Sequence, residues 1–116
     1  MTIHELAKKY YFHDSIITSV NYSANEQKLE IFMDFCHWAQ EWYKQGEPEL
    51  LKLRLTFSGI KEYHGITGDI DYFSILDADI KNDKYHLFIE DDYQHKFYEY
   101  YLEPTNIDVE TIGIAE

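Results

Sequence analysis

The sequence is poor in cysteine and arginine, and both shortages exclude classes of protein. Cys36 is the only cysteine, so the chain can form no internal disulfide and no cysteine-based zinc site. Arg54 is the only arginine, and nine lysines stand among 22 acidic residues. Because DNA affinity comes largely from Lys and Arg side chains that neutralise phosphates, we expect no nucleic-acid ligand.

Long apolar runs and glycine-rich loops are also missing. The longest stretch without a charged residue, 15–25, is half polar, whereas a membrane helix needs about 20 apolar residues. Residues 1–5 lack the basic and apolar regions of a secretory signal. The five glycines are spread along the chain and match no phosphate-binding fingerprint. We therefore expect a cytoplasmic protein with no membrane contact and no cofactor.

Acidic and aromatic side chains are abundant. The formal net charge is −12, and the chain contains 11 Tyr, 7 Phe and 2 Trp. Hydrophobic residues make up 45% of the chain, enough for the core of a single domain spanning residues 1–116. The charge favours a basic partner and repels DNA and anionic lipid. Alternatively, it only keeps a tyrosine-rich surface soluble.

The first element is predicted to be an amphipathic helix. Thr2 and Glu5 have the spacing of a capping box. Apolar residues then recur at intervals of three and four positions: Ile3, Leu6, Ala7, Tyr10 and Tyr11. We expect the helix to end near Phe12, before a turn at residues 13–15.

From Ser15 onward, apolar and polar residues alternate, most clearly in 29–35 and 51–57. Alternation of this kind predicts half-buried antiparallel strands. Further strands are expected near 15–22, 70–80, 85–89, 94–102 and 107–111, with a tight hairpin turn at Lys81–Lys84. The predicted fold class is α+β: an N-terminal amphipathic helix and seven or eight mostly antiparallel strands in a curled or two-layer sheet.

His13, Asp14 and Ser15 are the residue types of a serine hydrolase triad, but adjacent residues cannot form one. We interpret them as a structural turn in which Asp14 and Ser15 accept backbone amides, and we assign no catalytic residue. The alternative is a metal-assisted or hydrolytic enzyme. It would require His13 and Asp14 to converge with His37 or His64 in a cleft.

The six histidines and 22 carboxylates supply ample metal ligands, yet none has a recognised ligand spacing. Two Asp-x-Asp pairs stand out, Asp69 with Asp71 and Asp77 with Asp79. Because alternate residues of a strand share a face, we interpret each pair as part of a solvated acidic surface. No metal site is predicted.

The segment 37–49 is too long for a hairpin loop, and Trp38 and Trp42 are spaced as on one face of a short helix. We predict a partner-binding surface in which aromatic anchors are flanked by carboxylates. Its residues are Trp38, Trp42, Tyr43, Asp69, Asp71, Asp77 and Asp79. Two alternatives stay open: the tryptophans form a lid over one sheet face, or an aromatic strand edge pairs with itself in a homodimer or larger oligomer.

One segment resembles a known kind of protein. Phe12-His13-Asp14-Ser15-Ile16-Ile17, followed by a hydrophobic hairpin ending at Leu29-Glu30-Ile31 and a Trp-containing insertion, resembles small uncharacterised bacterial proteins in which an "HDS" turn opens a β-rich domain. Several such families are associated with polymorphic-toxin immunity proteins, acidic single domains that bind and neutralise a toxin. The resemblance covers about the first half of the chain. It implies a bacterial, non-enzymatic binding role and assigns no catalytic residue.

Overall fold

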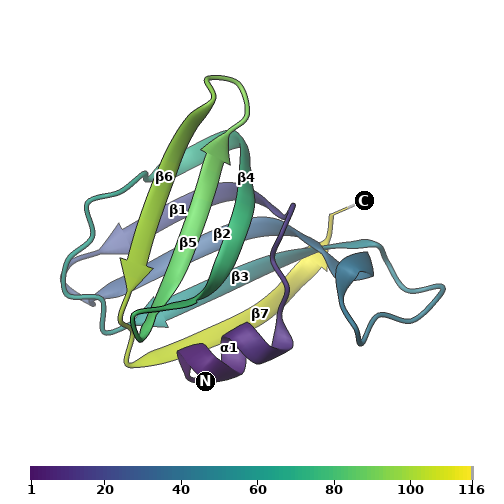
Figure 1. Ribbon diagram of the computed structural model, residues 1–116, viewed down its shortest axis with the longest axis horizontal. Helices are drawn as coiled ribbons and strands as arrows, with labels where there is room; N and C mark the ends of the chain where they lie inside the picture. The colour runs from purple at the N-terminus through teal and green to yellow at the C-terminus, as the bar shows by residue number, and fades with distance from the viewer. Residues whose placement is uncertain (116) are drawn as a thin grey trace.

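The computed structural model, described for residues 1–115, is one antiparallel sheet with one short helix. Its elements are α1 (Ile3–Lys9), β1 (Ile16–Ser23), β2 (Lys28–Cys36), the 3₁₀ helix η1 (His37–Ala39), β3 (Leu50–Ser58), β4 (Gly68–Lys81), β5 (Lys84–Asp91), β6 (Lys96–Leu102) and β7 (Asn106–Ile114). The strand order is β6-β5-β4-β1-β2-β3-β7, so the sheet is open, with β6 and β7 at its edges (Figure 1). The predicted sheet-rich α+β class is confirmed.

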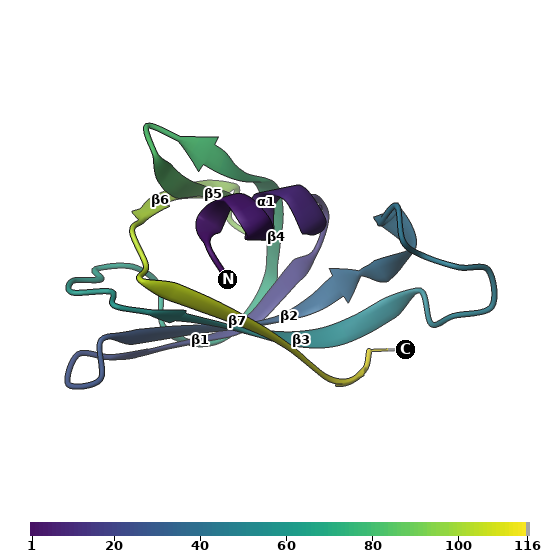
Figure 2. The ribbon, with the colours of Figure 1, turned by 90° about the horizontal axis from the view of Figure 1, so that it is seen from below.

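The sheet bends into two layers. Figure 2 shows β4, β5 and β6 lying over a layer made of β1, β2, β3 and β7. The bend coincides with an irregular register between β1 and β4, because Ile17 pairs with Phe73 whereas Ser19 pairs with Asp69. Tyr72, within this irregularity, has a left-handed backbone with φ of 57°. Bulges of this kind bend and twist a strand, which lets one long strand serve both layers.

Helix α1 lies at the open side between β4 and β7 (Figure 2). The predicted capping box is present: the Thr2 hydroxyl accepts the Glu5 amide at 3.2 Å, and the Glu5 carboxylate accepts the Thr2 amide at 3.0 Å. The terminal ammonium of Met1 donates to the carbonyl of Ile107 at 2.7 Å, which ties the start of the chain to β7.

The prediction of an amphipathic helix reaching Phe12 is corrected. The helix has seven residues, ends at Lys9 and fully buries only Leu6, so an amphipathic stripe is not clearly present. Tyr10 is already extended, with φ of −114° and ψ of 126°. Its ring contacts those of Phe12 and Phe35, and these tertiary contacts favour the extended conformation over another helical turn.

The core lies between the two layers. Its largest fully buried side chains include Phe12, Phe35, Phe57 and Tyr85. The alternation predicted for 29–35 is confirmed, because the odd-numbered residues of this stretch of β2 are buried and its even-numbered residues are partly exposed.

A second bulge decides which side chains of β4 face outward. Ile75 pairs with Ile89, but Asp77 pairs with Phe88, so Leu76 is the extra residue. In a regular strand Asp77 would share the core-facing side of Ile75. The bulge instead places Asp77 on the opposite face, and this reversal builds the site described next.

Candidate functional site

The outward face of β4, β5 and β6 combines carboxylates with aromatic rings. Cross-strand pairing places His86 opposite both Asp79 and Tyr101, and Phe88 opposite both Asp77 and Glu99. The rings of Phe88 and Phe97 stack with their centroids 5.6 Å apart. We call this surface the outer acidic face and define it by Asp77, Asp79, His86, Phe88, Phe97, Glu99 and Tyr101.

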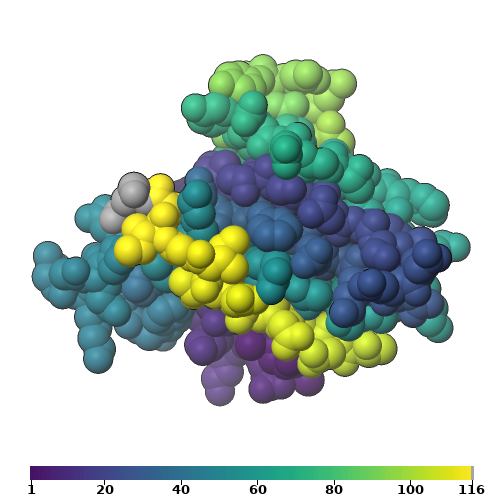
Figure 3. All heavy atoms as spheres, turned by 180° about the vertical axis from the view of Figure 1, so that it is seen from behind, coloured from purple at the N-terminus to yellow at the C-terminus, as the bar shows by residue number. Residues whose placement is uncertain are grey.

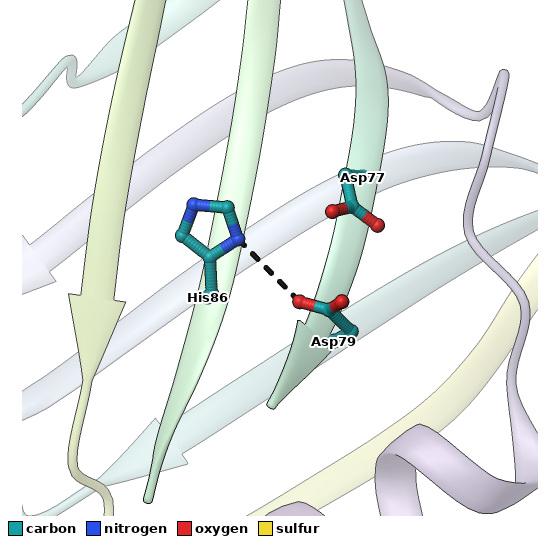
Figure 4. A group of neighbouring side chains, drawn as sticks. All are labelled: Asp77, Asp79 and His86. Carbon is teal, nitrogen blue, oxygen red and sulfur yellow. Dashed lines mark ion pairs between the residues drawn. The ribbon is translucent and has the colours of Figure 1, made fainter. Parts of the chain in front are cut away.

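His86 lies at the centre of this face and is only 1% exposed. The ring of Tyr101, 4.9 Å away, and that of Phe88, at 6.5 Å, pack against it. Nδ1 of His86 lies 3.5 Å from Oδ1 of Asp79, and Nε2 lies 3.1 Å from Oε2 of Glu99 (Figure 4 shows the first contact). Both contacts are within ion-pair distance, but among residues 1–115 neither ring nitrogen has an aligned hydrogen-bond partner, nor does Oδ1 of Asp79.

Neighbouring side chains of this face shift one another's pKa values. The contact with the His86 ring holds the pKa of Glu99 below its usual value, and the Tyr101 hydroxyl and Lys81 add to this effect. Desolvation raises the pKa of Tyr101, as does its contact with Glu99. On the core side, burial raises the pKa of Tyr85, and the charges of the two aspartates of this face raise it further. At neutral pH the face therefore presents an ionised Glu99 beside the neutral hydroxyl of Tyr101.

Asp77 and Asp79 also line a groove of about 490 Å³ between β4, the end of α1 and the segment after η1. Trp42 lines the groove from that segment, and Lys8 and Lys9 line it from the helix. The structure thus brings three residues of the predicted partner-binding surface together, although Trp42 and Asp77 are far apart in the sequence.

Trp42 is anchored yet partly open. Its indole Nε1 donates to the carbonyl of Lys9 at 3.2 Å, and its ring contacts Tyr10 and His37. The side chain is still 40% exposed. Trp42 therefore packs against the body of the protein, as the lid alternative expects, and keeps part of its ring available to a ligand.

Gln40 holds the segment after η1 in place. Its side chain accepts the Tyr11 amide at 2.9 Å and donates to the carbonyls of Tyr11 and Cys36, at 2.7 and 2.9 Å. The helix predicted to carry both tryptophans is only the three-residue η1, so that prediction is corrected. Trp38 lies in η1 and is 53% exposed.

Tyr43 packs edge-on against the buried ring of His37, with centroids 5.0 Å apart, and donates its hydroxyl to the carbonyl of Glu47. His37 in turn has Nδ1 2.7 Å from the carbonyl of Pro48, so Nδ1 carries the proton. These contacts give the side chains of both residues a structural role within the segment.

The other Asp-x-Asp pair lies elsewhere. Asp69 lines a separate groove with Phe32, Lys52 and Ile112 on the face of the β1–β2–β3–β7 layer that points away from the core, the side seen in Figure 3. Asp71 is exposed next to the irregular residue Tyr72. The four predicted aspartates therefore do not form one surface, because Asp69 and Asp71 both lie outside the groove that Asp77 and Asp79 line.

The His13–Ser15 turn directly precedes β1 and is hydrogen-bonded to β4. Asp14 has a left-handed backbone with φ of 68°, and its amide donates to the carbonyl of Ile75 at 2.9 Å. The hydroxyl of Ser15 is fully buried and accepts the amide of Cys36 at 3.1 Å. The Asp14 carboxylate lies beside the ring of His13, at 3.3 Å from Nδ1.

The residues named by the enzyme alternative form no metal-type cluster in the part of the chain that the structure describes. Within residues 1–115, the group of three His, Cys, Asp or Glu side chains close enough to share a metal ion is Asp77, Asp79 and His86. That group contains neither His13 nor Asp14.

Sequence reasoning missed His86, Glu99 and Tyr101. One signal for His86 was present: counting outward from the predicted turn at residues 82 and 83 pairs Asp79 with His86, as observed. The contacts of Glu99 and Tyr101 depend on how β6 pairs with β5, which no local pattern specifies.

Within the described residues, α1 and η1 are both much shorter than a membrane crossing requires, and no helix has the necessary length and apolar character. No protein-family model, curated protein or solved structure matches the chain.

Proposed function

We propose that the protein is a small acidic, non-enzymatic binding protein that recognises a basic protein partner. The observation that supports this proposal is the groove shared by Trp42, Asp77 and Asp79. A partly exposed indole beside carboxylates suits a Lys or Arg side chain, because the ring face attracts a cation and the carboxylates pair with it.

The distribution of charge supports a basic partner. The net charge of −12 would steer a positively charged protein toward this chain. The two lysines of the groove lie on its helix side. Asp77 and Asp79 lie on β4, where they continue into the outer acidic face, and Glu41 adds a third carboxylate from the segment after η1. Phe97, 57% exposed on that face, adds apolar area that a partner could cover.

An immunity-like role is part of the proposal. The segment Phe12–Ile17 resembles the "HDS" turn of families associated with toxin immunity, and the chain is acidic, as such proteins are. The partner would then be a toxin domain with a basic surface, and both would meet in the bacterial cytoplasm.

Capture of a partner followed by a binding titration tests this function. The wild-type chain, immobilised in the presence of EDTA, should retain a basic protein from a lysate of the source cells. With that protein purified, we expect Trp42→Ala and the double variant Asp77→Asn/Asp79→Asn each to weaken binding at least about tenfold, or 1.4 kcal/mol.

The double variant Asp69→Asn/Asp71→Asn is the matched control, because it removes the same charge from two residues outside the Trp42 groove. It should keep nearly wild-type affinity. Equal losses in the two double variants would indicate unspecific charge attraction, and failure to retain any basic protein would contradict the proposal.

A second candidate, self-association through β6, is favoured by one observation. β6 is an edge strand of the open sheet and carries the exposed rings of Phe97 and Tyr101. Edge strands with such rings can pair with a second copy. Light scattering distinguishes the two functions, because a mass of 13.9 kDa at all concentrations would exclude self-association.

A further inference from the structure

We propose that Asp77, Asp79 and His86 form a binding site for a divalent transition-metal ion, with Zn²⁺ as the best match. One ligand atom of each residue lies within 4.8 Å of the others. Figure 4 shows the two carboxylates of β4 and the ring of His86 on β5 next to one another. One imidazole nitrogen and two carboxylate oxygens are a ligand set that Zn²⁺ accepts. This site shares Asp77 and Asp79 with the proposed partner surface, but it goes beyond the partner function and does not depend on it.

The burial of His86 points to a ligand more directly than the cluster of acids does. A buried polar atom without a hydrogen bond is costly, and both ring nitrogens of His86 are in this condition. Nδ1 lies 3.5 Å from Oδ1 of Asp79, a second buried atom with no hydrogen-bond partner among residues 1–115. A cation bound by both atoms would satisfy them together.

Glu99 occupies the place of a positioning residue. Histidines that bind metal usually donate their other ring N–H to a carboxylate or carbonyl, which fixes the tautomer and the ring orientation. Oε2 of Glu99 lies 3.1 Å from Nε2 of His86, on the side of the ring away from Asp79. A proton on Nε2 would leave the lone pair of Nδ1 directed at the aspartates.

The dimensions and access of the cluster suit a small ion. Ligand atoms about 2.0–2.2 Å from a tetrahedral Zn²⁺ lie about 3.4 Å apart, so the three ligand atoms, now within 4.8 Å of one another, would move together by about 1 Å on binding. Asp79 can move because its side chain is half exposed. Asp77 and Asp79 also border the groove, through which an ion and a completing water could enter.

Calorimetric titration of the chelator-treated protein with Zn²⁺ tests the site. We expect one equivalent to bind with a Kd in the micromolar range or tighter. Asp77→Asn/Asp79→Asn should weaken this binding at least tenfold. Asp69→Asn/Asp71→Asn should leave it unchanged, because that pair has no partner histidine in a metal-type cluster within residues 1–115. Equal weakening in both variants would overturn the proposal.

A spectroscopic readout tests His86 as a ligand without replacing this buried residue, so the result does not depend on how a His86 variant folds. In the wild-type protein labelled with ¹⁵N, Zn²⁺ should shift the Nδ1 resonance of His86 and leave the ring of His95, which is exposed, unchanged. A shift at His95 instead of His86 would identify adventitious surface binding and overturn the site. The measurement uses no partner protein, so its failure would leave the proposed binding function standing.

Discussion

At the scale of single residues, two polar side chains form hydrogen bonds with backbone groups that are not paired within the sheet. The hydroxyl of Ser15 accepts the amide of Cys36 at the end of β2, and the side chain of Gln40 bonds to both backbone groups of Tyr11. These residues hold the first segment of the chain against the sheet. Ser15 therefore has a structural role. Because the residue is fully buried, its hydroxyl is not exposed as a nucleophile.

Ser15→Ala should lower the free energy of unfolding by about 1–3 kcal/mol, because the amide of Cys36 would lose its acceptor in a buried place. Urea denaturation followed by fluorescence measures the change. Ser23→Ala is the control, since the Ser23 hydroxyl accepts the amide of Glu26 at an exposed position. Equal stability of the two variants would contradict the role assigned to Ser15.

At the scale of elements, the sequence predicts the features that depend only on residues close together in the chain, such as helix caps and tight turns. The capping box of Thr2 and Glu5 and the turn at Asn82 and Asp83 were both predicted, and both are present. The end of α1 at Lys9 was not predicted, because it follows from the contact between Tyr10 and distant Phe35.

In the candidate site, too, one part follows from residues close together in the chain and another part depends on tertiary structure. The hairpin turn is enough to place Asp79 opposite His86. Which face they share depends on the bulge at Leu76, and a bulge is settled by strand pairing that the sequence of β4 alone does not specify. This is why the aspartates were predicted as a plain acidic surface and the histidine beside them was missed.

Asp83→Val should destabilise the protein by about 1–2 kcal/mol, because Asp83 has a left-handed backbone with φ of 61° that a β-branched residue adopts only with strain. Thermal and urea unfolding measure the effect. Asp108→Val makes the same replacement at an exposed position of β7, where a β-branched residue suits a strand, and it should be close to neutral. Wild-type stability of Asp83→Val would show that the turn does not require its observed conformation.

At the scale of the whole molecule, negative charge is in large excess over what the ion pairs can balance. Arg54, the only arginine, lies between Glu30 and Glu110. The lysines and this arginine number 10 against 22 acidic residues. The unbalanced carboxylates repel one another in the folded state, and they are also what a basic partner or a divalent cation would neutralise.

Raising NaCl from 0.01 to 0.15 M at pH 7 should therefore increase Tm, by about 4 °C or more if screening recovers about 1 kcal/mol. The screening length falls from about 30 Å to about 8 Å over this range, which weakens the long-range repulsion more than the close ion pairs. The pKa values of Glu5 and Glu99 are lowered, so both stay ionised at pH 7 and salt changes screening without changing their protonation.

Scanning calorimetry in EDTA measures this shift without interference from divalent ions. Choline chloride at equal ionic strength is the control, because screening by a bulky cation should raise Tm equally, whereas specific binding of Na⁺ would not be reproduced. A Tm that falls with salt would mean that attractive pairs such as Arg54 with Glu110 outweigh the repulsion. In that case the excess charge would not be a source of instability, and its neutralisation by a partner would not stabilise the fold.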